Sequence, residues 1–157
     1  MNMISNKSLV LSKSNDYILK TINYNTMKIE EIKHPELKNY INLVYMQGEN
    51  DNKKAILKLE EEIKEYIKSN VFIISIENNE AVKIPYGNDA EYVVPVFTDL
   101  REYTLGMQYF SLNVMDENKE YLLEKLDYFK KLKEDPKFLG YLVNISSASY
   151  IINTSLL

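Results

Sequence analysis

The chain contains no cysteine, a single histidine, a single arginine and only four glycines. Without cysteine it cannot form a disulfide framework, use thiol catalysis or bind a metal through cysteine. The four glycines are scattered, which excludes a glycine-rich phosphate loop. No apolar run approaches the roughly 20 residues that span a bilayer, and no signal-peptide pattern opens the sequence. These absences predict a cytoplasmic protein that does not enter the membrane.

A clustered basic charge is also missing. The net charge is −4, with 23 acidic and 19 basic residues, and Arg101 is the only arginine. Nucleic-acid and phosphate sites favour a basic surface and the bidentate arginine fork. Here lysines alternate with glutamates, as in segment 58–68 (KLEEEIKEYIK), which is typical of a solvated helix face. We therefore expect no nucleic-acid partner.

Helical periodicity is present in four segments, and polar or glycine residues mark their ends. The segments are 35–48, 56–67, 98–106 and 116–135. Pro35 suits a first helical position and Gly48 a stop. In the short third segment, Thr98 is expected to cap the helix and Gly106 to end it. Asp116 is expected to cap the fourth, whose apolar residues are Leu122, Leu126, Phe129 and Leu132.

Strand patterns fill most of the remaining chain, at 71–76, before Pro85, and at 91–97, 110–114, 138–145 and 150–153. The nearly continuous apolar run 71–76 is typical of a central strand buried on both faces. Pro95 cannot donate to a ladder, so we expect it at an edge, a strand end or a bulge. The predicted core residues are Phe72, Ile74, Val94, Leu126 and Val143.

At 157 residues with 45% hydrophobic side chains, the chain is long enough to bury one core. The order of elements predicts one α+β (mixed α/β) domain, with a mixed sheet of about five to six strands and helices packed against it. We assign residues 34–157 to this domain. Residues 1–33 form an N-terminal extension, in which alternation at 8–12 and 17–24 around a turn indicates a β-hairpin.

No arrangement of residues typical of catalysis is found. His34 precedes Pro35 in an expected loop, and we interpret it as a surface histidine, because no Gly-x-Ser-x-Gly elbow or other nucleophile motif accompanies it. Metal binding would depend on carboxylates alone, and no calcium-loop motif is present. Asp99 and Glu102 have the spacing of a capping box. We predict no enzyme activity, no catalytic residue, no metal ligand and no cofactor.

Segment 91–100 (EYVVPVFTDL) resembles the strand-to-helix signature of the SseB N-terminal-domain family, in which a (V/L)P(V/A)FT strand runs into a short helix. The order of elements over roughly 36–155 also fits that family, including a late strand at 140–145 (GYLVNI). The chain departs from the pattern where Ile145 replaces a proline after Asn144, and where residues 146–147 replace a glycine-containing turn. The resemblance implies a small prokaryotic protein that acts as a binding or regulatory module, without an established enzyme activity.

The family signature marks five candidate interaction residues: Phe97, Thr98, Asp99, Arg101 and Asn144. A strand that runs into a helix N-terminus exposes amides that can bind an acidic group of a partner. A structural alternative is that Phe97 lies in the core and Thr98 caps the helix.

Three functions stay open. The first is a non-enzymatic protein-interaction or regulatory module of the SseB-like kind, with another protein as its partner. The second is an immunity-type protein that neutralises a basic toxin. The third is a small-molecule-binding or enzymatic domain that has no linear motif.

Overall fold

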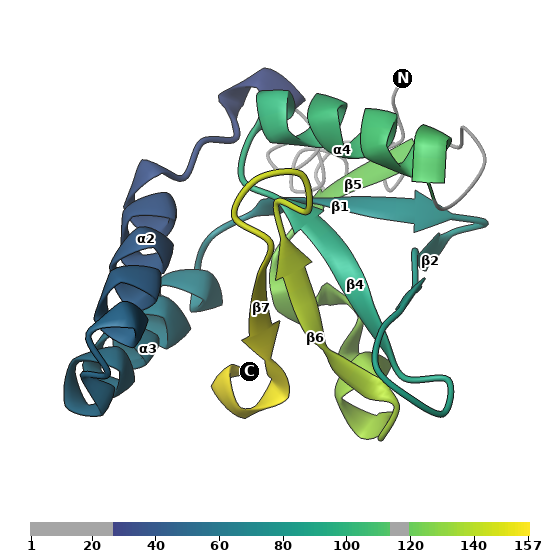
Figure 1. Ribbon diagram of the computed structural model, residues 1–157. Helices are drawn as coiled ribbons and strands as arrows, with labels where there is room; N and C mark the ends of the chain where they lie inside the picture. The colour runs from purple at the N-terminus through teal and green to yellow at the C-terminus, as the bar shows by residue number, and fades with distance from the viewer. Residues whose placement is uncertain (1–26, 114–119) are drawn as a thin grey trace, which may run out of the picture.

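Helices flank a mixed β-sheet in the described part of the chain (Figure 1). The computed structural model describes residues 27–113 and 120–157. Its helices are α2 (Pro35–Glu49), α3 (Lys53–Lys68) and α4 (Leu100–Asn113), and its 3-10 helices are η2 (Ile29–Glu31), η3 (Leu126–Tyr128), η4 (Lys130–Glu134) and η5 (Thr154–Leu156). The two predicted helices at 35–48 and 56–67 are confirmed.

The strands are β1 (Phe72–Glu77), β2 (Glu80–Ala81), β3 (Ile84–Pro85), β4 (Tyr92–Phe97), β5 (Glu120–Glu124), β6 (Phe138–Val143) and β7 (Tyr150–Asn153). Strand β1 pairs with β5, β4 and β2, and the sheet continues from β4 through β6 to β7. Only the β4–β6 pair is parallel among the described pairs. The predicted α+β domain with one mixed sheet is confirmed. The seven described strands include two of only two residues each, of which β3 corresponds to the strand predicted before Pro85, while β2 was not predicted.

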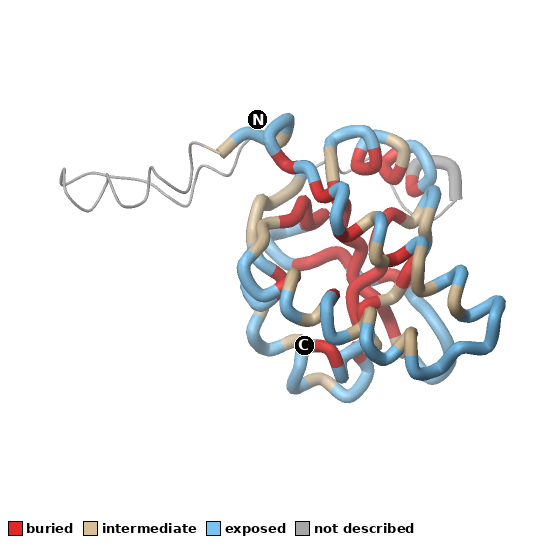
Figure 2. The backbone as a smooth tube through the Cα atoms, turned by 90° about the vertical axis from the view of Figure 1, so that its left-hand side faces the viewer, coloured by how far each residue is buried: buried red, intermediate tan, exposed pale blue. Residues whose placement is uncertain are grey.

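Each face of the sheet is covered by different helices. Alternate residues of β1 belong to two cores: Phe72 and Ile74 pack with α2 and α3, while Ile73 packs with α4. Figure 2 shows the buried residues concentrated in the interior, where the strands lie. All five predicted core residues are buried in the first of these cores. Burying each large aliphatic side chain contributes about 1.5–3 kcal/mol, so β1 is a central element of the fold, as predicted.

Pro95 lies inside strand β4 and not at a strand end, and the side that its nitrogen faces is locally unpaired, which agrees with the predicted edge position. Strand β1 pairs only with Val96 and Phe97 of β4, and β3 pairs only with Tyr92 and Val93. The Tyr92 amide and the Val96 carbonyl both bond toward β6, so the Pro95 nitrogen faces the opposite side, where β1 has already diverged. The missing amide therefore leaves no ladder acceptor unsatisfied.

Helix α4 is longer than predicted, and Gly106 does not end it. A Cβ atom at Gly106 would lie 2.3 Å from Cε1 of Phe97, so the glycine lets the helix pack closely on β4. The helix continues through Phe110, whose side chain is buried between the helix and the sheet. The predicted strand at 110–114 is therefore wrong. Tertiary packing explains this glycine better than a helix stop does.

Residues 120–124 form a strand, where the sequence predicted part of a helix capped by Asp116. Strand β5 pairs with β1 along five consecutive positions, from Phe72↔Glu124 to Ile76↔Glu120. Leu126, Phe129 and Leu132 follow in the 3-10 helices η3 and η4 and their junction. The backbone N–H and C=O groups along this edge of β1 need hydrogen-bond partners. Because β5 supplies them, residues 120–124 form a strand although the apolar residues at 122–132 have helical spacing.

The predicted β-hairpin at 8–12 and 17–24, the cap at Asp116 and the strand end at Val114 lie outside the described residues. Ile32, which we assigned to the N-terminal extension, is buried in the core beneath α4. Within residues 27–113 and 120–157, no helix is long and apolar enough to cross a membrane.

Candidate functional site

Strands β4 and β6 run parallel as neighbours, so their carboxyl ends meet at one edge of the sheet. Such an edge is where open α/β sheets place their ligand sites. Thr98 and Asp99 follow β4 directly, and Asn144 follows β6. Helix α4 begins at the same edge, as Figure 1 shows. The resemblance therefore marked residues that the fold brings together.

Asn144 joins the two strand ends. It is 1% exposed, and its amide oxygen accepts a hydrogen bond from the Thr98 backbone nitrogen at 3.1 Å. Its amide nitrogen donates to the Thr98 hydroxyl at 2.9 Å. Its backbone has φ 54°, a left-handed conformation that asparagine tolerates better than most residues. Both amide atoms of Asn144 are therefore used to hold the β4 end to the β6 end.

Asp99, and not Thr98, caps helix α4. One Asp99 carboxylate oxygen accepts from the Glu102 amide at 3.0 Å, and the Asp99 carbonyl accepts the first helical bond from Tyr103. The Thr98 hydroxyl donates to the other carboxylate oxygen at 2.9 Å. The predicted cap at Thr98 is wrong by one residue. The Thr98 hydroxyl bonds to the side chains of Asp99 and Asn144, and the Glu102 amide in the first turn of the helix donates to Asp99 instead.

Lys38 of α2 completes this network. Its ammonium lies 2.9 Å from the Asp99 carboxylate. Burial pushes the pKa of Asp99 upward, but the hydrogen bonds from Lys38, the Glu102 amide and Thr98 outweigh it, so this pKa falls below its ordinary value. Asp99 therefore stays ionised at neutral pH.

A second link ties α4 to the loop after β6. The Ser147 hydroxyl donates to a carboxylate oxygen of Glu102 at 2.8 Å, and Glu102 is buried. Neither Lys38 nor Ser147 was predicted, because both lie far along the chain from Asp99 and carry no local motif.

The five candidate residues have different environments. Phe97 is fully buried and packs on Tyr103. Thr98 and Asn144 are buried within the network, Asp99 is partly buried, and Arg101 is exposed. Only Asp99 and Arg101 of these five therefore present charge toward a partner.

Two shallow hollows flank Lys38. One, of about 480 Å³, reaches Lys33, Asp99, Leu100 and Arg101. The other, of about 460 Å³, extends to Tyr45, Asn144 and Ser147. Lys38 lines both hollows. We call this continuous surface the Lys38 face and define it by its accessible charged and large side chains, which are Glu30, Lys33, Lys38, Tyr45, Asp99, Leu100 and Arg101.

His34 borders this surface but is buried, and the prediction of a surface histidine is wrong. The residue is 5% exposed, and its ring stacks on that of Phe72 with 4.3 Å between the ring centroids. Nε2 lies 2.6 Å from the Val71 carbonyl oxygen, so it carries the proton and donates. Nδ1 then accepts from the Tyr66 hydroxyl, also at 2.6 Å. With both nitrogens bonded, the ring has no free lone pair to act as a base.

Stability should fall as the pH drops below His34's ordinary pKa of 6.5. Burial lowers the pKa of folded His34, outweighing the Val71 hydrogen bond and the charge of Asp99, which raise it. The unfolded chain therefore binds the proton first, and the free energy of unfolding decreases by up to about 1.4 kcal/mol per pH unit until the folded pKa is reached. Urea unfolding between about pH 7.5 and 5.5 measures this slope.

The variant His34→Gln is the control for this titration. It should be less stable than the native chain, yet its stability should change less over the same pH range because the titrating ring is gone. Asp99, whose pKa is lowered from 3.8, loses its contribution only at more acidic pH. An equally steep slope in His34→Gln would assign the titration to another group.

The polar side chains of this network bond to groups of the protein itself. The Thr98 and Ser147 hydroxyls donate to carboxylates, and His34 is not bonded to either hydroxyl. Within the described ranges, no three His, Cys, Asp or Glu side chains gather as metal ligands do. The arrangement can fix the two strand ends and the start of α4, and it holds Lys38 at the surface. No protein-family model matches the chain, and neither the curated proteins nor the solved structures contain a match to it.

Proposed function

We propose that this chain is a non-enzymatic, cytoplasmic protein-interaction module of the SseB-like kind, and that it binds another protein through the Lys38 face. The observation that carries the proposal is the contrast at this edge of the sheet. The buried polar groups bond to one another, while the surface around them is broad, shallow and mixed in character. A shallow surface suits a macromolecule better than a small ligand, which usually requires a deeper pocket.

The composition of the Lys38 face supports a protein partner. Tyrosine and arginine are enriched at the energetic centres of interfaces, and the only arginine of the chain lies here beside the exposed Leu100. Asp99 is neutralised by Lys38, and the two cations of Lys33 and Arg101 exceed the single carboxylate of Glu30, so the face has a small positive excess within a chain of net charge −4. We expect the partner to present an acidic segment with apolar neighbours.

The two alternatives are less well supported at this face. An immunity protein for a basic toxin would present mainly acidic groups, whereas here Lys33, Lys38 and Arg101 outnumber the two carboxylates of Glu30 and Asp99. An enzyme would need an unengaged base or nucleophile, whereas the hydroxyls, His34 and Asp99 are engaged in hydrogen bonds within the fold.

Charge reversal tests the proposal. Affinity purification from the source cells would identify proteins bound by the native chain, and each would then be titrated as a purified protein. Arg101→Glu should weaken the specific partner about tenfold or more, which corresponds to about 1.4 kcal/mol. The loss should shrink at high salt because the contact is electrostatic. Arg101 is exposed, so the variant should melt at the native temperature.

The matched control is Lys58→Glu, which reverses the same charge at an exposed position outside both hollows. It should leave the affinity within about twofold. A partner that binds Arg101→Glu and the native chain equally well would show that the Lys38 face is not the binding surface.

A further inference from the structure

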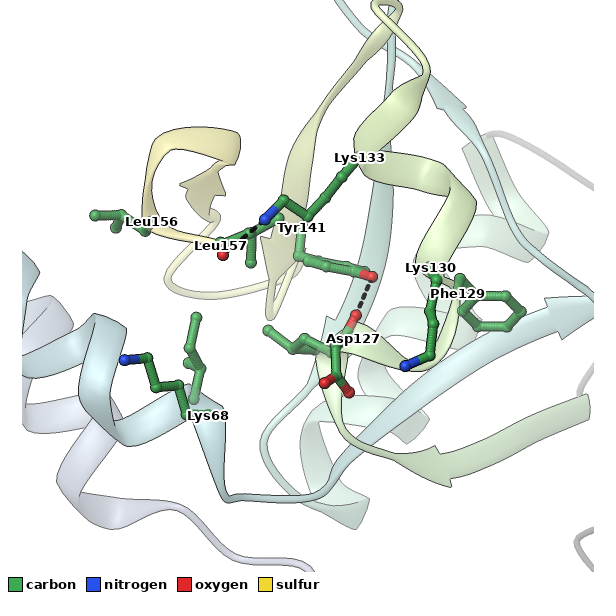
Figure 3. Close-up of a pocket in the computed structure, with 10 residues that line it drawn as sticks. Lys68, Asp127, Phe129, Lys130, Lys133, Tyr141, Leu156 and Leu157 are labelled. Atoms are coloured by element: carbon green, nitrogen blue, oxygen red, sulfur yellow. Dashed lines mark hydrogen bonds between the residues drawn. The ribbon is translucent and has the colours of Figure 1, made fainter.

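A third hollow lies at the other end of the molecule from the start of α4, between the end of α3, the η3–η4 segment and the C-terminal turn η5 (Figure 3). It encloses about 310 Å³, and its apolar walls include Ile67, Leu126, Tyr141 and Leu156. The hydroxyl of Tyr141 donates to the Leu126 carbonyl, so this wall keeps its polar atom satisfied and presents the ring. The interior therefore suits an apolar group.

The rim of this hollow is basic. Lys68 stands on the α3 side, and Lys130 and Lys133 stand on the η4 side, as Figure 3 shows. Lys133 is held at the rim, because its ammonium donates to the main-chain oxygen of Leu157 at 2.9 Å. An ammonium has three donors, so two remain for a ligand. Lys68 is ion-paired with the carboxylate of Glu65, which offsets its charge, so Lys130 and Lys133 are the main anion-binding groups.

The size of the hollow limits the ligand. An apolar cavity of about 150 Å³ holds a benzene molecule, so about 310 Å³ accommodates one apolar group of about a dozen non-hydrogen atoms. That volume is too small for a lipid with two long acyl chains. Lysines recognise an anion as point charges, without the fork that arginine offers to phosphate. The carboxylate of Asp127 shares the rim and disfavours a doubly charged head group.

We propose that this hollow binds a small amphipathic monoanion, namely a carboxylate with one short aliphatic or aromatic group, whose apolar part fills the cavity while Lys130 and Lys133 bind the head group. This site is distinct from the Lys38 face and does not depend on the proposed protein partner.

Titration calorimetry with octanoate, octanol and octylammonium tests the proposal, since the three probes share one chain and differ in head-group charge. Octanoate should bind one-to-one with a Kd of about 1 mM or tighter. Octanol should bind about fivefold or more weakly, and octylammonium should not saturate. Amide NMR shifts should change at Ile67, Leu126, Tyr141 and Leu156, which places the ligand in this cavity.

Variants separate the two parts of the site. Lys130→Ala combined with Lys133→Ala should weaken octanoate about fivefold or more and leave octanol unchanged. Asp127→Asn should tighten octanoate about twofold or more, a gain that loss of structure would not produce. The control Lys58→Ala removes an exposed lysine elsewhere on α3 and should have no effect. Circular dichroism confirms that each variant folds.

Any one of several results would overturn the proposal. They are the absence of saturable octanoate binding up to about 5 mM, equal binding of all three probes, and octanoate affinity that is unchanged in the double lysine variant. NMR shifts confined to the Lys38 face would also overturn it, because the anion would then bind elsewhere.

Discussion

Replacing Gly140 with alanine should destabilise the domain by about 3–5 kcal/mol, an exceptionally large loss for a single methyl group. Gly140 has φ +140°, which L side chains rarely adopt, and a Cβ there would lie 2.2 Å from the Ile152 carbonyl oxygen. It would also approach Cα of Asn153 to 2.9 Å. Both atoms belong to the backbone of β7, which pairs with Gly140 in register. The clash cannot be relieved unless β6 and β7 move apart.

Urea unfolding of Gly140→Ala beside Gly48→Ala measures this effect. Gly48 is a helical position with no other atom within 4 Å of an added Cβ, so its replacement should stabilise the fold by about 0.5–1 kcal/mol through the unfolded chain. The two variants add the same methyl group and should change stability in opposite directions. A loss below about 1 kcal/mol for Gly140→Ala would mean that the β6–β7 pair yields easily.

Those parts of the fold whose local pattern and tertiary surroundings agree were predictable. Helix α2 has Pro35 at its start and an apolar stripe that packs on the sheet, and the run 71–76 is apolar on both sides because both faces are covered. The strands at 138–145 and 150–153 were also predicted, and they pair with each other. The hydrophobic periodicity and the residues that mark the ends of helices and strands indicate these elements directly.

The failures occur where a distant contact decides the local structure. Residues 122–132 have apolar side chains at helical spacing, yet the open edge of β1 makes 120–124 a strand. A glycine such as Gly106 is typical of a helix end, but here the absence of a side chain makes room for the Phe97 ring. His34 precedes a proline in a connecting segment, and its burial depends on Val71 and Tyr66. These contacts join residues that are distant in the sequence, so the local sequence pattern does not indicate them.

The candidate site was predictable only in part, through the segment that resembles the SseB signature. Segment 91–100 supplied Thr98 and Asp99, and the late strand at 140–145 supplied Asn144, which the fold joins to Thr98 across 46 positions. The contributions of Lys38 and Ser147 depend on the packing of α2 and of the loop after β6 against this edge. Nothing in the sequence around this lysine or this serine indicates that its side chain bonds to a residue of α4 or of the segment before it.

Replacing Asn144 with alanine should lower the free energy of unfolding by about 2–4 kcal/mol. The change removes both hydrogen bonds to Thr98 and leaves the buried Thr98 amide without its partner, which costs about 1–3 kcal/mol. It also places alanine at φ 54°, where an ordinary side chain costs about 1–2 kcal/mol. Urea unfolding at neutral pH measures the total.

Two further variants divide this loss into its causes. Asn144→Gly accepts the left-handed backbone without strain, so its loss reports the missing hydrogen bonds, and it should be about 1 kcal/mol more stable than Asn144→Ala. Thr98→Val removes the hydroxyl while keeping the shape of the side chain. Combined with Asn144→Ala, it should show a coupling of about 1 kcal/mol, because each variant removes the same bond. Strictly additive losses would show that the bond from Asn144 to the Thr98 hydroxyl contributes nothing, and the side-chain link between β4 and β6 would then depend on the Thr98 amide bond alone.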